Sequence, residues 1–102
     1  MRFLIIAFPK FSPPLDQLPA LVEAEKGWHE RHRDRLEVHG WFVGGGGFVI
    51  ANVEDDVTLN QVVMEHPFTP FSDVQVRAFV DHETGSRQLQ QFVQEVIRAS
   101  GS

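Results

Sequence analysis

The sequence predicts an α+β fold in which four strands and two main helices follow one another as βαββαβ, with a further helix at the C-terminus. Three observations predict it. Residues 3–8 form a short apolar run that Pro9 ends, as expected of a buried strand. Apolar side chains recur at helical spacing in three later segments. Residues 74–80 alternate between apolar and polar side chains, which indicates another strand.

The first half of the chain is expected to hold one strand and one long helix. The strand covers residues 2–8, and a loop with prolines follows at 9–14. Asp16 is a suitable helix cap, and Pro19 suits a first helical turn. We expect this helix to continue to about His39, where Gly40 stops it.

The second half is expected to alternate strands with helices. The expected elements are a strand at 41–43, a glycine turn at 44–47, a strand at 48–53, a helix opened by Asp55 and Asp56, a proline-broken loop at 66–73, a strand at 74–80 and a helix from Ser86.

This order of elements predicts a ferredoxin-like arrangement. Right-handed crossovers place both main helices on one face of a four-stranded antiparallel sheet. The first strand is apolar on both faces, so the face without helices also needs cover, and the same face of a second copy is the simplest cover. We therefore expect a homodimer or a higher homo-oligomer. A single domain is expected over residues 1–99, with 100–102 as a tail.

Composition limits the classes of function. The net charge of -5 argues against a nucleic-acid partner. The chain has no cysteine, which excludes disulfides, thiol catalysis and zinc–thiolate sites. The apolar run at 3–8 is too short to span a membrane and lacks the flanks of a signal peptide, so we expect no membrane partner and a cytoplasmic location.

Polar side chains interrupt the apolar face of the first expected helix. The seam consists of Leu18, Leu21, Val22, Trp28 and Leu36, and the same steps of three and four reach Glu25, His29 and His32. A carboxylate beside an imidazole sets its tautomer and raises its basicity, so these three residues are the catalytic candidates. If the stripe is shifted by one residue, the histidines lie instead at a charged, solvent-exposed edge.

A metal is not expected at these residues. The stretch from His29 to His32 is one residue too short for the zinc protease motif. Glu25, His29 and His32 could together bind a metal in principle, but the spacing offers no further ligand, so neither a metal nor another cofactor is expected.

Further side chains are candidates for binding a substrate: Trp28, Trp41, Arg77, His66, Phe68 and Phe71. The aromatic residues suit an apolar pocket wall, although such residues are more often plain core. Arg77 suits a carboxylate or a developing oxyanion, although an interface ion pair is commoner for a lone cation in a strand. His66 suits a pocket mouth or a surface loop. The glycine run at 44–47 allows close approach of a ligand or makes a hairpin turn, and it is no nucleotide loop.

Several of these motifs resemble known families. The stretch from His29 to His32, then Leu36, Gly40 and the glycine run, resembles the YciI-like proteins, in which a helix-one histidine precedes a glycine by eleven residues. His29 matches the active-site histidine proposed for that family. The stretch from Pro67 to Phe71, the residues Asp73 to Val76, and Glu25 with Lys26 resemble muconolactone isomerase. Both families belong to the dimeric α/β-barrel superfamily, which implies two ferredoxin-like sheets packed face to face.

The resemblance implies chemistry without a cofactor. We expect an isomerase or cyclase of catabolism or secondary metabolism that moves a proton on a small, largely apolar carbonyl compound or lactone. His29 or His32 shuttles the proton, Glu25 orients or assists, and Arg77 or an amide of the glycine run holds an oxyanion. Two alternatives stay open: a non-enzymatic ligand-binding or interaction module, and a cofactor-free monooxygenase of the same fold.

Overall fold

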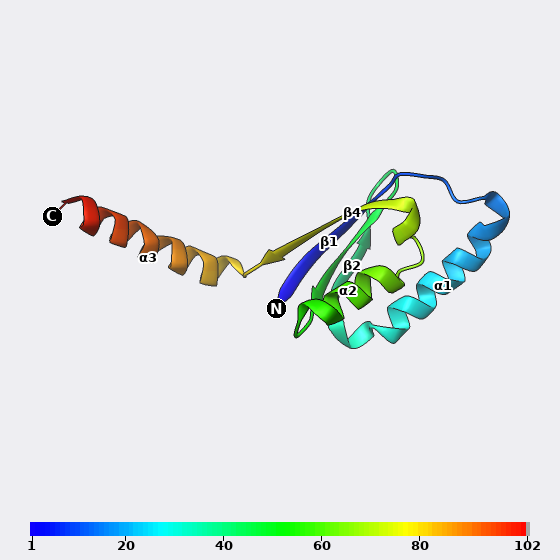
Figure 1. Ribbon diagram of the computed structural model, residues 1–102, viewed down its shortest axis with the longest axis horizontal. Coiled ribbons are helices and arrows are strands. Elements are labelled where there is room, and N and C mark those ends of the chain that lie inside the picture. The colour runs from blue at the N-terminus through cyan, green and yellow to red at the C-terminus, as the bar shows by residue number, and fades with distance from the viewer. Residues whose placement is uncertain (102) are drawn as a thin grey trace.

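The computed structural model describes residues 1–101 and has one four-stranded sheet with helices on one of its faces (Figure 1). The elements in chain order are β1 (Arg2–Pro9), η1 (Leu15–Gln17), α1 (Leu18–Arg31), η2 (Arg33–Arg35), β2 (Leu36–Trp41), β3 (Gly47–Asn52), α2 (Asp56–Glu65), η3 (Thr69–Phe71), β4 (Ser72–Phe79) and α3 (His82–Gly101). The strands lie in the order β2-β3-β1-β4, and every neighbouring pair is antiparallel. The predicted ferredoxin-like α+β fold with a C-terminal helix is therefore confirmed.

The core lies between the sheet and the pair α1 and α2. Trp28 of α1 and Val62 of α2 are buried against Val49 and Ala51 of β3. The Trp28 indole also donates a hydrogen bond to the carbonyl of Val62 at 2.9 Å, which fixes the two helices to each other. These contacts determine which face of α1 points at the sheet.

The opposite face of the sheet is bare of helices. Phe3 and Ile5 of β1 pack on the core, so Leu4 and its neighbour across the ladder on β4, Arg77, point to the other side. Apolar side chains of β1 and β3 lie on this open face, as the first strand predicts. That a second copy covers it stays a prediction.

The first long helix is shorter than the sequence suggests, and this expectation was wrong. α1 ends at Arg31, η2 follows, and residues 36–41 form β2 instead of helix. The reason is that residues 36–41 pair with β3, with His39 opposite Val49. Hydrogen bonds between the two strands satisfy the backbone N–H and C=O groups that would otherwise bond within a helix. The predicted second strand at 41–43 is accordingly displaced toward the N-terminus.

The glycine turn between β2 and β3 has a specific steric cause. Gly44, Gly45 and Gly46 all have positive φ angles, between 88° and 122°. A Cβ on Gly46 would collide with the carbonyl oxygen of Ala7 on β1, whereas one on Gly44 would meet open space. The turn therefore requires glycine for backbone conformation and, at Gly46, for space as well.

The last helix projects away from the rest of the molecule (Figure 1). It begins at His82, four residues earlier than expected, because the Asp81 carboxylate caps it by accepting the amide of Thr84 at 2.8 Å. It continues to Gly101, through most of the expected tail, and Ser102 lies outside the described residues. Its apolar side chains are exposed: Leu89, Phe92, Val93, Val96 and Ile97. Among the described residues, no helix has the length and hydropathy needed to cross a membrane.

Candidate functional site

A cavity of about 440 Å³ lies between the two core helices and the sheet. Its walls come from all four strands, the loop after β1, α1, the glycine turn, α2 and the loop that leads into β4. Most of the lining is apolar. The polar side chains in it are Ser12, Glu25, His39, His66, Thr69 and Ser72.

Glu25 supplies the carboxylate of the cavity. It lies on the sheet-facing side of α1, one helical turn before Trp28, and its side chain is only 12% exposed. The Oε1 atom is buried and has no hydrogen-bond partner among the described residues. A buried oxygen without a partner is costly in a native protein, and such atoms often mark a functional role or a ligand.

His39 faces Glu25 from β2. Its Nε2 atom lies 3.5 Å from the Glu25 Oε1 atom, and its Nδ1 atom lies 2.7 Å from the Nδ1 atom of His29. Burial lowers the pKa of His39, the Glu25 carboxylate opposes this, and the neighbouring His29 lowers it further. His39 is thus a largely neutral imidazole at pH 7 that touches both an acid and a second imidazole.

His66 lies at the C-terminal end of α2 and also lines the cavity. Burial, with a smaller contribution from His39, lowers its pKa to about 4. The Nδ1 atom accepts the backbone amide of Phe68 at 3.1 Å, which places the ring proton on Nε2. The ring meets the Trp28 indole edge to face, with centroids 4.5 Å apart. His66 is therefore a neutral hydrogen-bond donor held in one orientation.

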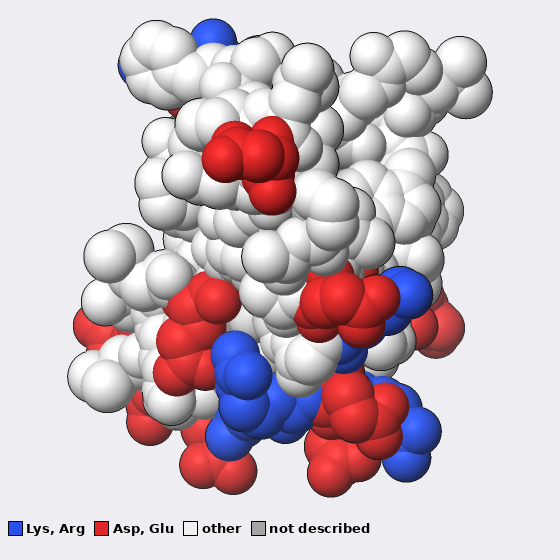
Figure 2. All heavy atoms as spheres, turned by 90° about the vertical axis from the view of Figure 1, so that its right-hand side faces the viewer, with Lys and Arg blue, Asp and Glu red and all other residues white. Residues whose placement is uncertain are grey.

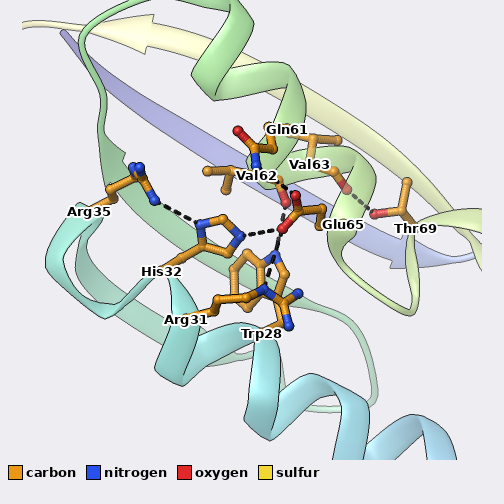
Figure 3. A network of polar contacts seen from close by, with 9 residues as sticks. All are labelled: Trp28, Arg31, His32, Arg35, Gln61, Val62, Val63, Glu65 and Thr69. Atoms are coloured by element: carbon orange, nitrogen blue, oxygen red, sulfur yellow. Dashed lines mark hydrogen bonds and ion pairs between the residues drawn. The ribbon is translucent and has the colours of Figure 1, made fainter.

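His32 is held outside the cavity by charged partners (Figure 3). Its Nε2 atom lies 3.0 Å from a Glu65 oxygen, and its Nδ1 atom lies 3.2 Å from the Arg35 guanidinium. Arg31 and Gln61 also contact Glu65, and hydrogen bonds, first from Gln61 and then from His32, lower the pKa of that carboxyl. Both nitrogens of the buried His32 ring are thus used: Nε2 joins the end of α1 to α2, and Nδ1 joins it to η2.

The structure brings together most, but not all, of the residues singled out in the sequence. The residues that line the cavity are Glu25, Trp28, Trp41, His66, Phe68 and Phe71, together with Gly46 and Gly47 of the glycine run. His29 lies just outside it, behind His39. Arg77 is on the open face of the sheet, where alternation along β4 directs it away from the helices.

Sequence reasoning missed His39 as a site residue, because it was assigned to the end of a helix. A signal was present: Glu37, His39 and Trp41 alternate with Val38 and Gly40, which is a strand pattern. Gly40 also has a strand role, since the ring of Phe48 on β3 occupies the space where a Cβ would lie.

Figure 2 shows where charged side chains lie on one face of the molecule. Lys and Arg side chains there lie beside Asp and Glu at one end, and most of the remaining face carries neither. Among the described residues, no group of three or more His, Cys, Asp or Glu side chains has the geometry to hold a metal ion.

Comparison with known proteins identifies the fold. No family model and no curated protein matches the chain. Among solved structures, muconolactone isomerase superposes with a TM-score of 0.70 at 20% identity, over 80% of this chain and 91% of that one. The chain has the muconolactone isomerase-like fold. This confirms the sequence resemblance at the level of fold, while the resemblance to the YciI-like proteins stays a prediction.

A second solved structure has the same fold with a different activity. It is 5-chloro-2-hydroxyhydroquinone dehydrochlorinase from Burkholderia phenoliruptrix AC1100 in complex with 2,5-dihydroxybenzoquinone. It matches with a TM-score of 0.65 at 18% identity, over 82% of this chain and 98% of that one. The fold therefore serves two different enzymes that act on small molecules, and the chemistry of this chain has to be argued from its own site.

Proposed function

We propose that this protein is a cofactor-independent isomerase or cyclase that transfers a proton on a small, largely apolar carbonyl compound or lactone. The observation that carries the proposal is the Glu25 carboxylate, whose buried Oε1 atom has no hydrogen-bond partner among the described residues although it lines an apolar cavity. An unpaired oxygen at that position is free to accept a proton from a bound carbon acid.

His66 supplies the complementary group. Abstraction of a proton beside a carbonyl builds negative charge on the carbonyl oxygen, so a hydrogen-bond donor must lie there. The fixed Nε2–H of His66 is such a donor, and its low pKa keeps the ring neutral at pH 7. Neutral imidazole donors polarise carbonyls in known enolisation chemistry.

The size and lining of the cavity favour a small cyclic substrate. Its volume of about 440 Å³ lies at the lower end of the range for small-molecule sites. Trp28 and Phe71 provide flat apolar walls. The neighbours support this size class, since one is named for a lactone and the other binds a dihydroxybenzoquinone.

Solvent isotope exchange on a panel of candidate compounds tests the proposal. Small lactones and enolisable cyclic ketones, muconolactone included, are incubated with the protein in D₂O, and loss of carbon-bound hydrogen is followed by proton NMR. We expect exchange or isomerisation of at least one compound, reduced about 10²–10⁴-fold in Glu25→Gln. His82→Asn on the distant helix α3 is the control and keeps full activity.

Two results would overturn the proposal. One is a wild-type protein that binds members of the panel, as ligand-induced shifts show, yet exchanges none of them, which favours a binding module. The other is Glu25→Gln exchanging at the wild-type rate with an unchanged circular dichroism spectrum.

A further inference from the structure

A second, more open depression lies outside the cavity and shares part of its wall. It is lined by Glu25, Lys26, His29, Glu30, His39 and Trp41. Glu25, His39 and Trp41 line both the cavity and the depression, whereas His29 lines only the depression. Glu25, His39 and Trp41 therefore form a partition between the interior and the surface.

The groups across this partition follow one another in space, with an ion-pair distance at the first gap and a hydrogen bond at the second. Glu25 Oε1 lies 3.5 Å from His39 Nε2, and His39 Nδ1 lies 2.7 Å from His29 Nδ1. The two rings are nearly parallel, at 22°, with centroids 4.9 Å apart. Glu25 and His29 are four residues apart on α1, so the helix itself sets their spacing on either side of His39.

We propose that His39 and His29 form a proton relay that carries a proton from Glu25 to the solvent in this outer depression. The relay rests on the proposed function, in which Glu25 receives the proton from the substrate. His29 does not reach the cavity and acts through His39, so it is a positioning and relay residue.

The proton steps balance within the residues present. Protonated Glu25 gives its proton to His39 Nε2, His39 gives its Nδ1 proton to His29 Nδ1, and His29 releases its Nε2 proton to water. One proton leaves, Glu25 returns to its carboxylate form, and both rings end neutral in the opposite tautomer. The short contact between the rings contains one N–H both before and after transfer, so it is satisfied in either direction.

The groups around His39 and His29 favour two neutral rings over two imidazolium cations. The ionisable groups that face His39 are Glu25 and His29 of α1 and His66 beyond α2. Burial, and then His29, lower the pKa of His39, with Glu25 acting against them. Charging both adjacent imidazoles is unfavourable because the two positive charges repel each other. A single proton in the hydrogen bond between the two rings avoids this repulsion.

NMR of the free protein tests the relay without a substrate. In protein with ¹⁵N-labelled histidine, we expect a scalar coupling between the two Nδ1 nuclei across the hydrogen bond. We also expect the titration and tautomer of His39 to change in His29→Phe, which keeps a ring but removes the nitrogens. His82→Asn, on α3, leaves both observations unchanged. Absence of the coupling, together with a His39 titration that is the same in His29→Phe and wild type, would overturn the relay.

Chemical rescue tests the same step during turnover. With the exchanging compound from the panel, we expect His29→Ala to lose about 10-fold or more in rate, within the range of a proton-transfer group. Added imidazole restores the rate, because it enters the vacated depression. His29→Phe is equally slow but is not rescued, since its ring fills that space. A His29→Ala protein that keeps the wild-type rate at every buffer concentration contradicts the relay.

The two proposals fail in different ways. A wild-type protein that binds members of the panel but exchanges none of them contradicts the function of Glu25, and the inter-ring coupling and the His39 titration still decide whether the imidazoles share a proton. A protein in which Glu25→Gln is inactive while His29→Ala is unaffected keeps the proposed function and loses the relay.

Discussion

Partly buried His66 makes the stability of this protein sensitive to mild acid. Its pKa is about 4 in the folded protein against an ordinary 6.5, chiefly because of burial. As pH falls below about 6.5, the unfolded chain binds a proton at this residue and the native protein does not, so unfolding becomes more favourable. The loss ends when the native ring is itself protonated, at a pH of about 4.

The magnitude follows from the size of the shift. One pKa unit corresponds to about 1.4 kcal/mol, so the full shift is linked to about 3 kcal/mol. Between a pH of about 7.5 and one of about 4.5, His66 should account for a loss of about 2.5 kcal/mol in the free energy of unfolding. The capping carboxylates Asp55 and Asp81, whose pKa values are also lowered by hydrogen bonds from the amides they cap, lose their contributions at still lower pH.

The assay is urea unfolding at both pH values, at fixed protein concentration, for wild type and His66→Asn. Asn keeps an acceptor for the Phe68 amide but does not titrate. We expect the acid-induced loss to be about 2.5 kcal/mol smaller in His66→Asn, while His82→Asn behaves as wild type. The remaining loss in the variant includes His39, whose pKa is lowered in the same direction. Equal losses in wild type and His66→Asn would refute the reasoning.

Three further predictions concern the scaffold. Trp28→Phe removes the donor to the buried Val62 carbonyl, so unfolding by urea should show a loss of about 1–3 kcal/mol, whereas Trp41→Phe at an exposed ring should cost less than about 0.5 kcal/mol. Gly46→Ala should lower the thermal midpoint more than Gly44→Ala, because both positions have positive φ but only a Cβ on Gly46 meets the Ala7 carbonyl; equal midpoints would contradict the steric argument. Native mass spectrometry at micromolar concentration should show a homodimer that Ile6→Glu, on the open sheet face, disrupts; a wild-type monomer would contradict the predicted interface.

The sequence predicts the fold well because each strand carries its own pattern. The apolar first strand and the alternating fourth strand are adjacent in the sheet, and both lie close to their expected residues. Helix boundaries are harder, because they depend on what the chain can pair with elsewhere. The charged residues 33–35 continue the polar pattern of α1, whereas residues 36–41 pair with β3 and form β2.

The candidate site was predictable only in part for the same reason. Glu25 and Trp28 follow from the helical stripe, which does not depend on tertiary contacts. His39 reaches Glu25 through the position of β2, and Arg77 is directed away through the register of β4. Both outcomes depend on which face of a strand meets the helices, and a shift of one residue reverses that choice.

Four histidines lie close together here, and the contacts of their ring nitrogens separate their roles. His32 uses both nitrogens on charged neighbours, so it has none left for a ligand. His66 uses one on a backbone amide and keeps one N–H, which suits a fixed donor.

His39 and His29 use one nitrogen each on the other, and His39 turns its second toward Glu25. Among these four histidines, only the His39–His29 pair is open at both ends. The His39 end faces the buried Glu25 carboxylate, and the His29 end faces the outer depression. His32, whose ring contacts Glu65, instead holds the end of α1 against α2. A proton that enters at Glu25 therefore leaves through the rings of His39 and His29.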